Sequence, residues 1–279
     1  MTVLADRARD LADAVAIYGR LASAQLRAQM QYRVPFFMDM ITTFLATATD
    51  FIAIALFFLR FKDIGGWRMP EVALLYGLVS TSFAVVDMFG KGFEEFADLV
   101  RMGRFDALLI RPRSAILQVL GSELQTRVIG RFVQSIGVLV AACVLLDARS
   151  QWSWFDWCFL VLTIFGGALF FAGVVLLSAT SCFWTVESVE AANIFTYGSV
   201  ETGSFPMHIY PAALRRFYMY VVPLAFVCYY PALYLLRKPD PLGLSPYVQF
   251  LALPICAAVL WVGLAAWRVG VRHYVSTGS

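Results

Sequence analysis

The 279-residue chain is too apolar and too poor in charge for a soluble protein. Hydrophobic residues make up 60% and charged residues 15%, against about 45–50% apolar and about 25% charged in a soluble domain. This composition excludes a soluble enzyme, a secreted disulfide scaffold and a nucleic-acid-binding domain, and the net charge of +3 does not indicate a polyanionic partner. We expect an all-α integral membrane protein surrounded by the lipid bilayer.

Residues 6–33 carry apolar side chains at helical spacing, with arginines and aspartates on the opposite face. This segment is too charged to cross a membrane, so the pattern predicts an amphipathic interfacial helix that lies along the membrane surface. Pro35 disfavours helical geometry at Val34. We therefore expect the interfacial helix to end there.

Seven apolar segments follow, and each is a candidate membrane span. They cover about 36–59, 71–90, 130–146, 157–184, 186–206, 212–236 and 247–267. Pro223 and Pro231 interrupt the sixth segment, and proline breaks the hydrogen-bond ladder of a helix. Broken helices survive at membrane depth only where protein or water covers them, so this segment is the weakest candidate for a full span.

The lysines and arginines favour one orientation. With both termini and the stretch 91–131 in the cytoplasm, 14 basic residues lie inside and 8 outside, as expected for a bacterial inner membrane protein. The number of full spans is then even, which predicts six membrane helices. We expect 212–236 not to cross fully; the alternative is that 186–206 does not cross and 212–236 does.

No motif indicates catalysis, a metal or a nucleotide. Five cysteines stand singly in apolar runs, which is typical of small hydrophobes in membrane helices, and two histidines are too few for a His-rich metal site. The sequence contains no GxxxxGK[ST], so the chain has no phosphate loop of its own. We expect no catalytic residue and no bound metal or cofactor, and any ATP must be bound by another subunit.

The stretch 91–113 sets apolar side chains among charges. Phe93, Phe96, Val100 and, after Gly103, Phe105 and Leu109 form an apolar series among these charges. The pattern predicts a short helix, a break at Gly103, and a second short helix ended by Pro112. Such a frame favours a helix that docks into a groove of a soluble partner; the alternative is an ordinary solvated loop with an interfacial helix.

Several carboxylates lie near membrane depth, where each costs about 2.5–3.5 kcal/mol by the lower scale. They are Asp39, Asp50, Asp87, Glu187, Glu190 and Glu201. One interpretation is that some of them line a path for a cationic or polar substrate, with Glu201 as the best single candidate. The alternative is that they cap helix ends, as favoured for Glu187 and Glu190, or pair with arginines such as Arg127 and Arg131.

Two blocks of sequence resemble the ABC-2 type transporter permeases. Residues 101–112, RMGRFDALLIRP, are similar to the RxGxxDxxLxRP pattern in the first cytoplasmic loop of a subfamily of uncharacterised permeases. About a hundred residues downstream, FPMHIYP at 205–211, PLAF at 223–226 and YYPA at 229–232 resemble the YPxxIYP…PLAF…YxPA block of that subfamily. Phe205 stands where tyrosine is usual.

The resemblance implies a single ABC-2 type transmembrane domain over 1–279. It implies six membrane helices, an N-terminal interfacial helix, a coupling helix in the 91–113 loop, and a re-entrant helical segment on the outer side, within 207–240, before the last helix. It also implies two permease chains around a central path, with two ABC ATPase subunits that bind ATP and Mg²⁺ and drive export. A sister chain as the second permease is expected, and a homodimer is the alternative.

The resemblance also assigns roles to residues. The docking residues would be Phe93, Glu94, Glu95, Phe96, Arg101, Gly103, Arg104, Phe105, Asp106, Leu109, Arg111 and Pro112. Independently of the resemblance, the carboxylates near membrane depth give the path candidates Glu201, Glu187, Glu190, Asp87 and Asp50. The aromatic residues give the outer gate candidates Phe205, Tyr210, Phe226 and Tyr230, although these aromatics also suit an interfacial belt. The alternative function is a proton-coupled secondary transporter, which the carboxylates favour and the lack of an inverted repeat disfavours.

Overall fold

The computed structural model describes residues 19, 23–25, 27, 29–111, 114–123, 125–185, 189–243 and 246–274, with the backbone alone for 189–193 and 246. Helices dominate this part of the chain, and its only β structure is an isolated bridge between Ile64 and Trp67. The expected all-α fold is confirmed for these residues. Most of the expected interfacial helix over 6–33 lies outside them.

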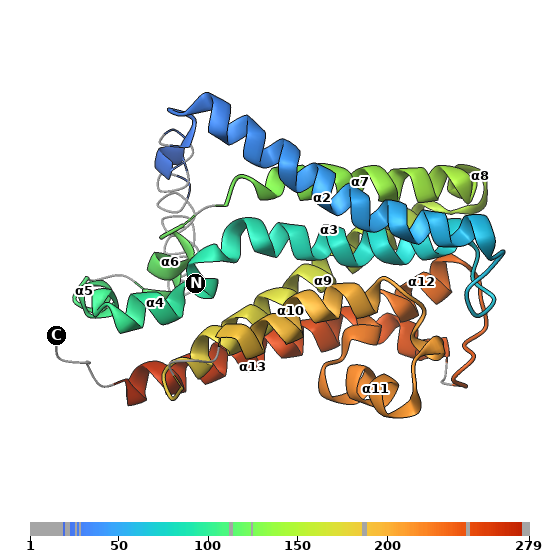
Figure 1. The fold of residues 1–279 in the computed structure, drawn as a ribbon. Coiled ribbons are helices and arrows are strands. Elements are labelled where there is room, and N and C mark those ends of the chain that lie inside the picture. Colours follow the sequence, from blue (N-terminus) through green and yellow to red (C-terminus); the bar gives the residue numbers. More distant parts are fainter. Residues whose placement is uncertain are drawn as a thin grey trace, which may run out of the picture.

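Five long apolar segments run side by side along the molecule (Figure 1), and each is long and apolar enough to cross a membrane. In chain order they contain α2 (Arg33–Arg60), α3 (Met69–Glu94), α7 (Val128–Leu145), α9 (Trp154–Ser181) and α13 (Ala252–His273). A helix satisfies its own backbone hydrogen bonds, which lipid cannot do. The chain therefore has the architecture of a multi-pass membrane protein.

α3 forms the centre of the bundle, because it packs against both α7 and α9, and α9 in turn packs against α13. Two glycines allow the contact between α9 and α13. A Cβ at Gly173 would lie 2.7 Å from the backbone nitrogen of Leu260, and one at Gly263 would lie 2.9 Å from the carbonyl oxygen of Gly173. Small residues of this kind let helix backbones approach closely in lipid.

α2 is peripheral: it packs mainly on α7 and buries one residue, Thr47. Its start corrects one expectation from the sequence. The helix begins at Arg33, so Val34 is helical and the preceding turn falls at 30–32. Pro35 is tolerated because it lies in the first turn, where a backbone N–H has no intrahelical acceptor in any case.

The segment 212–236 is a bent helical pair. The first half, Ala212–Val221, comprises α11 (Ala212–Arg216) and a π-helical turn, η2 (Phe217–Val221). The second half, Leu224–Leu235, comprises η3 (Leu224–Phe226) and α12 (Tyr229–Leu235), and it meets the first at 73°. The break at Pro223 was expected. Counted as one span, the pair brings the total among the described residues from five to six, so six full spans stay a prediction.

α10 (Val189–Gly203) covers only part of the expected span 186–206. Its 15 residues rise about 22 Å at roughly 1.5 Å per residue, which is less than the roughly 30 Å of a hydrocarbon core. A turn and a short 3₁₀ helix, η1 (Met207–Ile209), follow. Within the described residues, neither 186–206 nor 212–236 is therefore a straight full span by itself.

Short helices gather at the two ends of the bundle (Figure 1). α4 (Phe96–Arg101), α5 (Arg104–Leu109) and α6 (Ala115–Leu120) lie at one end, which we call the α5 end. α8 (Ala148–Gln151), α11 and α12 lie at the other, the α8 end, and η4 (Pro246–Leu251) leads into α13. The described part of the loop 91–131 thus contains three short helices between α3 and α7.

Candidate functional site

α4 and α5 form a helical hairpin that continues directly from α3. Gly103 separates the two helices at a φ of 66°, in the left-handed region that glycine adopts without a steric penalty. The break expected at Gly103 is therefore present.

Aromatic rings attach this hairpin to the ends of α9 and α13. The ring centroids of Phe96 and Phe105 lie 4.9 Å apart. Phe96 also lies 5.2 Å from Phe183 and 4.9 Å from Trp267, and Phe105 contacts the same two rings. Phe93 adds an edge-on contact with Trp267 at 5.4 Å. The ends of α3 and α9 thus meet α4, α5 and α13 in one aromatic cluster, which fixes the hairpin to the bundle.

The expectation that these rings contact a partner is wrong for Phe93, Phe96 and Phe105, because the chain's own core encloses them. They are only 6%, 0% and 0% exposed. The exposed apolar surface of the hairpin instead comes from Leu109, which was predicted, and from Met102 and Ile110, which were not. The available signal was that Met102 stands beside the Gly103 break and Ile110 at the end of α5, where apolar side chains have no neighbouring helical turn to cover them.

The charges predicted for the hairpin rim divide into two groups. Arg101, Arg104 and Arg111 are exposed, and Arg101 lies 3.6 Å from Asp98 in an exposed pair. Glu94 and Glu95 each lie 3.3 Å from the Lys91 ammonium group, so Lys91 partly neutralises both.

Asp106 faces the end of α13 and not the solvent alone. Burial, and then the nearby Asp106, raise the pKa of Tyr274 to about 12. The ring of Phe105, next to Asp106 on α5, lies 5.1 Å from the Tyr274 ring, and this contact holds α5 against the chain after α13. Pro112 lies outside the described residues.

Asp87 is buried in an ion pair and does not face an open path. Its side chain is 3% exposed, and the guanidinium of Arg131 on α7 donates to its carboxylate. The same guanidinium lies 5.5 Å from the ring centroid of Phe83 and 5.7 Å from that of Tyr197. The prediction that Asp87 lines a transport path is therefore wrong, and the alternative that it pairs with Arg131 is confirmed.

Asp50 on α2 and Glu201 on α10 are exposed on this chain, and we call the surface that carries them the uncovered face. The two carboxylates lie close enough for their charges to interact. The Tyr76 hydroxyl on α3 lies 3.2 Å from the Thr47 carbonyl oxygen of α2 and 3.4 Å from the Gln134 side-chain oxygen of α7. The structure thus brings together two of the predicted path residues. Glu187 lies outside the described residues, as does the side chain of Glu190.

The four gate candidates lie in and just before the bent pair. Tyr210 donates a hydrogen bond to the Thr202 carbonyl oxygen at 3.0 Å, and the rings of Phe226 and Tyr230 lie 5.0 Å apart. Phe205, Tyr210 and Phe226 are half-buried, whereas Tyr230 is 1% exposed. Tyr230 therefore serves as packing in this structure.

Lys238 and Arg237, just after α12, form structural ion pairs that the sequence did not predict. The Lys238 ammonium group lies 2.6 Å from the Glu71 carboxylate and 4.8 Å from the Trp67 ring centroid. The guanidinium of the neighbouring Arg237 lies 2.8 Å from Asp156 at the start of α9. These contacts fix the bent pair to α3 and α9 at the α8 end.

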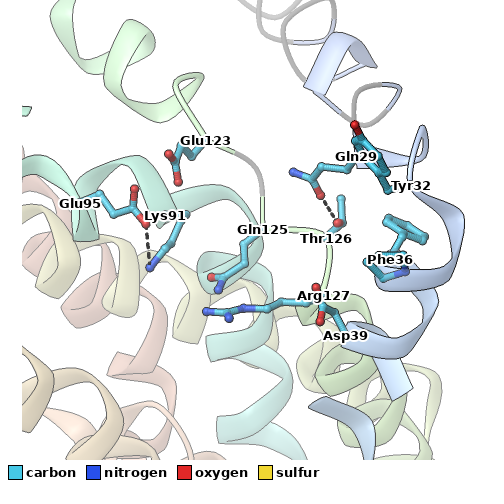
Figure 2. Close-up of a pocket in the computed structure, with 11 residues that line it drawn as sticks. Gln29, Tyr32, Phe36, Asp39, Lys91, Glu95, Glu123, Gln125, Thr126 and Arg127 are labelled. Atoms are coloured by element: carbon cyan, nitrogen blue, oxygen red, sulfur yellow. Dashed lines mark hydrogen bonds and ion pairs between the residues drawn. The ribbon is translucent and has the colours of Figure 1, made fainter. Parts of the chain in front are cut away.

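A polar cavity of about 370 Å³ lies at the α5 end (Figure 2). It is bounded by the start of α2, the end of α3 and the chain that enters α7. Its lining residues are Gln29, Tyr32, Pro35, Phe36, Asp39, Lys91, Glu95, Glu123, Gln125, Thr126 and Arg127. Of these, Glu95 was predicted as a docking residue, and its position in a cavity wall was not expected.

In a comparison with protein-family models, residues 44–278 match a model described as an ABC-2 family transporter protein. This match confirms the resemblance at the level of the family, while the subfamily stays a prediction. No curated protein and no solved structure matches the chain.

Proposed function

Since the chain belongs to the ABC-2 transporter family, we propose that it is the permease subunit of an ABC exporter and forms half of the transport path. As a member of that family, it is a multi-pass membrane component of an ABC transporter, it associates with an ABC ATPase, and it has no ATPase site of its own. We propose one transmembrane domain over 1–279 and two docked ATPase subunits, which bind the ATP and Mg²⁺.

The exposed rim of the α4–α5 hairpin is the observation that carries this proposal. Met102, Leu109 and Ile110 are 58%, 40% and 84% exposed, and the cations Arg101 and Arg104 lie among them. Apolar anchors with a charged rim are what a helix presents when it docks into a groove. The rim is therefore the surface that we assign to the ATPase.

The aromatic cluster beneath the rim would transmit movement. Phe96 and Phe105 pack against Phe183 of the α9 end and Trp267 of α13. Close-packed interiors are hardly compressible. Closure of the ATPase pair would therefore move the hairpin and these helices together, as a rigid-body rotation.

We propose that the α5 end is cytoplasmic, with both termini on that side of a bacterial inner membrane. The exposed arginines of the hairpin support this orientation under the positive-inside rule. The bent pair would then lie on the outer side as a re-entrant segment. There Phe205, Tyr210 and Phe226 would form the gate.

The uncovered face supports a second permease chain. A carboxylate that faces lipid at the bilayer centre costs about 2.5–3.5 kcal/mol by the lower scale, so Asp50 and Glu201 must face protein or water. We propose that a second permease, a sister chain or another copy, covers this face and encloses the path between the two chains. Asp50 and Glu201 would then line that path.

Co-purification of the ATPase tests the docking assignment. The double variant Met102→Glu, Ile110→Glu places two carboxylates in the proposed apolar contact, where an unpaired charge is strongly unfavourable. We expect at least about a tenfold loss of co-purified ATPase. The matched control is Leu59→Glu, at a residue 83% exposed in the last turn of α2 at the α8 end, which should retain the ATPase. Equal recovery with the double variant would sink the docking assignment.

A further inference from the structure

The polar cavity lies where three membrane-spanning helices begin or end. It is bounded by Tyr32 and Phe36 at the start of α2, by Lys91 near the end of α3, and by Arg127 directly before α7. The ends of spans mark the boundary between hydrocarbon and water. Tyrosine is also a typical residue of that boundary, and Tyr32 is 70% exposed. The cavity therefore opens at the depth of the lipid headgroups.

One wall of the cavity carries two carboxyl groups that face each other. Burial, and then a hydrogen bond and the charge of Glu95, raise the pKa of Glu123, while Lys91 acts in the opposite direction. Lys91 lies 3.3 Å from Glu95 and is shared with Glu94. Within the described residues, Glu123 takes part in no ion pair. A cation that donates hydrogen bonds to Glu123 and Glu95 would reduce the repulsion between these two carboxyl groups.

Arg127 supplies a cation on the adjoining side. Figure 2 shows its side chain extending beneath Gln125, toward the side of the cavity on which Lys91 lies. Its guanidinium contacts the neutral amide oxygen of Gln125, whose nitrogen faces Asp87. The next arginine, Arg131, is neutralised by Asp87, whereas no ion pair engages Arg127 within the described residues. A guanidinium with available donors is well suited to a phosphate group.

We propose that this cavity binds the headgroup of a phospholipid that carries both a phosphate and a primary ammonium group, the chemistry of phosphatidylethanolamine. Glu123 and Glu95 accept hydrogen bonds from the ammonium group, and Arg127 donates to the phosphate. Tyr32 and Phe36 line the side toward α2. The volume of about 370 Å³ lies within the range of about 300–1,000 Å³ typical of small-molecule sites.

The charges select among lipids. A quaternary choline group has no N–H to donate to the carboxyl pair, so phosphatidylcholine would lose that half of the site. The phosphate of phosphatidylglycerol would meet Arg127, but its headgroup has no cation for Glu123 and Glu95. Of the three lipids, phosphatidylethanolamine should therefore bind most tightly.

Native mass spectrometry of the purified full chain, titrated with each of the three lipids, tests this proposal. We expect phosphatidylethanolamine to bind the unsubstituted chain about tenfold more tightly than the other two, as for the loss of one charged hydrogen bond. Glu123→Gln should abolish the preference over phosphatidylcholine. Arg127→Gln should weaken all three lipids by about tenfold, and the control Arg149→Gln, at an exposed arginine of α8, should change nothing.

Two results would overturn the proposal. One is equal affinity of the unsubstituted chain for the three lipids, or an unchanged preference in Glu123→Gln. The other is binding of soluble O-phosphoethanolamine as tight as that of the lipid, because the site would then belong to a soluble ligand with the same chemistry. The exposed side chains of Glu123 and Arg127 allow both variants to fold, and a thermal melting curve of each confirms it.

Discussion

α2 and α3 have equal mean hydropathy over their most apolar windows, yet the bundle treats them differently. Other helices cover most of α3, whereas α2 buries only Thr47. A high mean hydropathy predicts that a helix is buried away from water. It does not predict whether the helix is surrounded by lipid or by other helices of the protein. α3 is therefore the packed centre of the subunit, which we call its frame, whereas α2 forms part of the surface of the subunit.

The carboxylates make the same distinction. Asp87 on α3 is enclosed and paired with Arg131. Asp50 on α2 is exposed, and the described residues show no ion pair for it. Asp87 is therefore neutralised within the chain, whereas Asp50 requires contact with water or with a second chain.

We expect the largest loss of unfolding free energy when Asp87 is substituted. Asp87→Ala removes the buried carboxylate and leaves the half-buried Arg131 without its partner, and breaking a buried pair in this way costs about 3–5 kcal/mol of unfolding free energy. The measurement is denaturant unfolding of the purified chain in detergent, followed by tryptophan fluorescence. The control Asp50→Ala should stay within about 0.5 kcal/mol. Equal losses in the two variants would remove the distinction between frame and surface.

A matched pair of leucines sharpens the comparison without charges. Leu78 on α3 is 0% exposed and Leu45 on α2 is 57% exposed. Leu78→Ala should leave a cavity and cost about 2–5 kcal/mol, whereas Leu45→Ala should change the unfolding free energy by less than about 0.5 kcal/mol. The same unfolding assay on both variants measures the difference. A large loss at Leu45 would show that α2 is already packed within the subunit.

The smallest expected effect is on the pH dependence of stability, and it comes from Glu123 in the polar cavity between the start of α2 and the end of α3. The pKa of Glu123 is raised in the folded chain by burial and by Glu95, so the folded state holds a proton that the unfolded state releases. Stability should therefore fall as the pH rises from the ordinary glutamate pKa of 4.5 through the folded value, and then level off. Glu123→Gln should flatten this slope in a pH series of melting curves, and an unchanged slope would contradict the assignment.

The sequence predicted the long helices to within a few residues, because apolar length alone defines them. The start of α9 moved from 157 to Trp154 because Ser153 and Asp156 form a capping box that hydropathy does not detect. The spacing of Phe93, Phe96 and Phe105 predicted an apolar face. It did not show that Phe183 and Trp267, far along the chain, would cover it.

The anchoring of the bent pair was not predictable from local pattern. Lys238 and Glu71 are 167 positions apart, and neither lies in a motif that suggests the other. The pairing of Asp87 was partly predictable, since Arg131 was one of its two predicted arginine partners. Choosing between a path and an ion pair required the packing of α3 against α7.

The mass of the intact assembly tests the central claim most directly. Native mass spectrometry of the complex, extracted with its ATPase in lipid discs, should give two permease chains, either two copies or this chain and a sister, together with two ATPase chains. A mass that contains one permease chain would contradict the account, because the uncovered face with Asp50 and Glu201 would then be left to lipid.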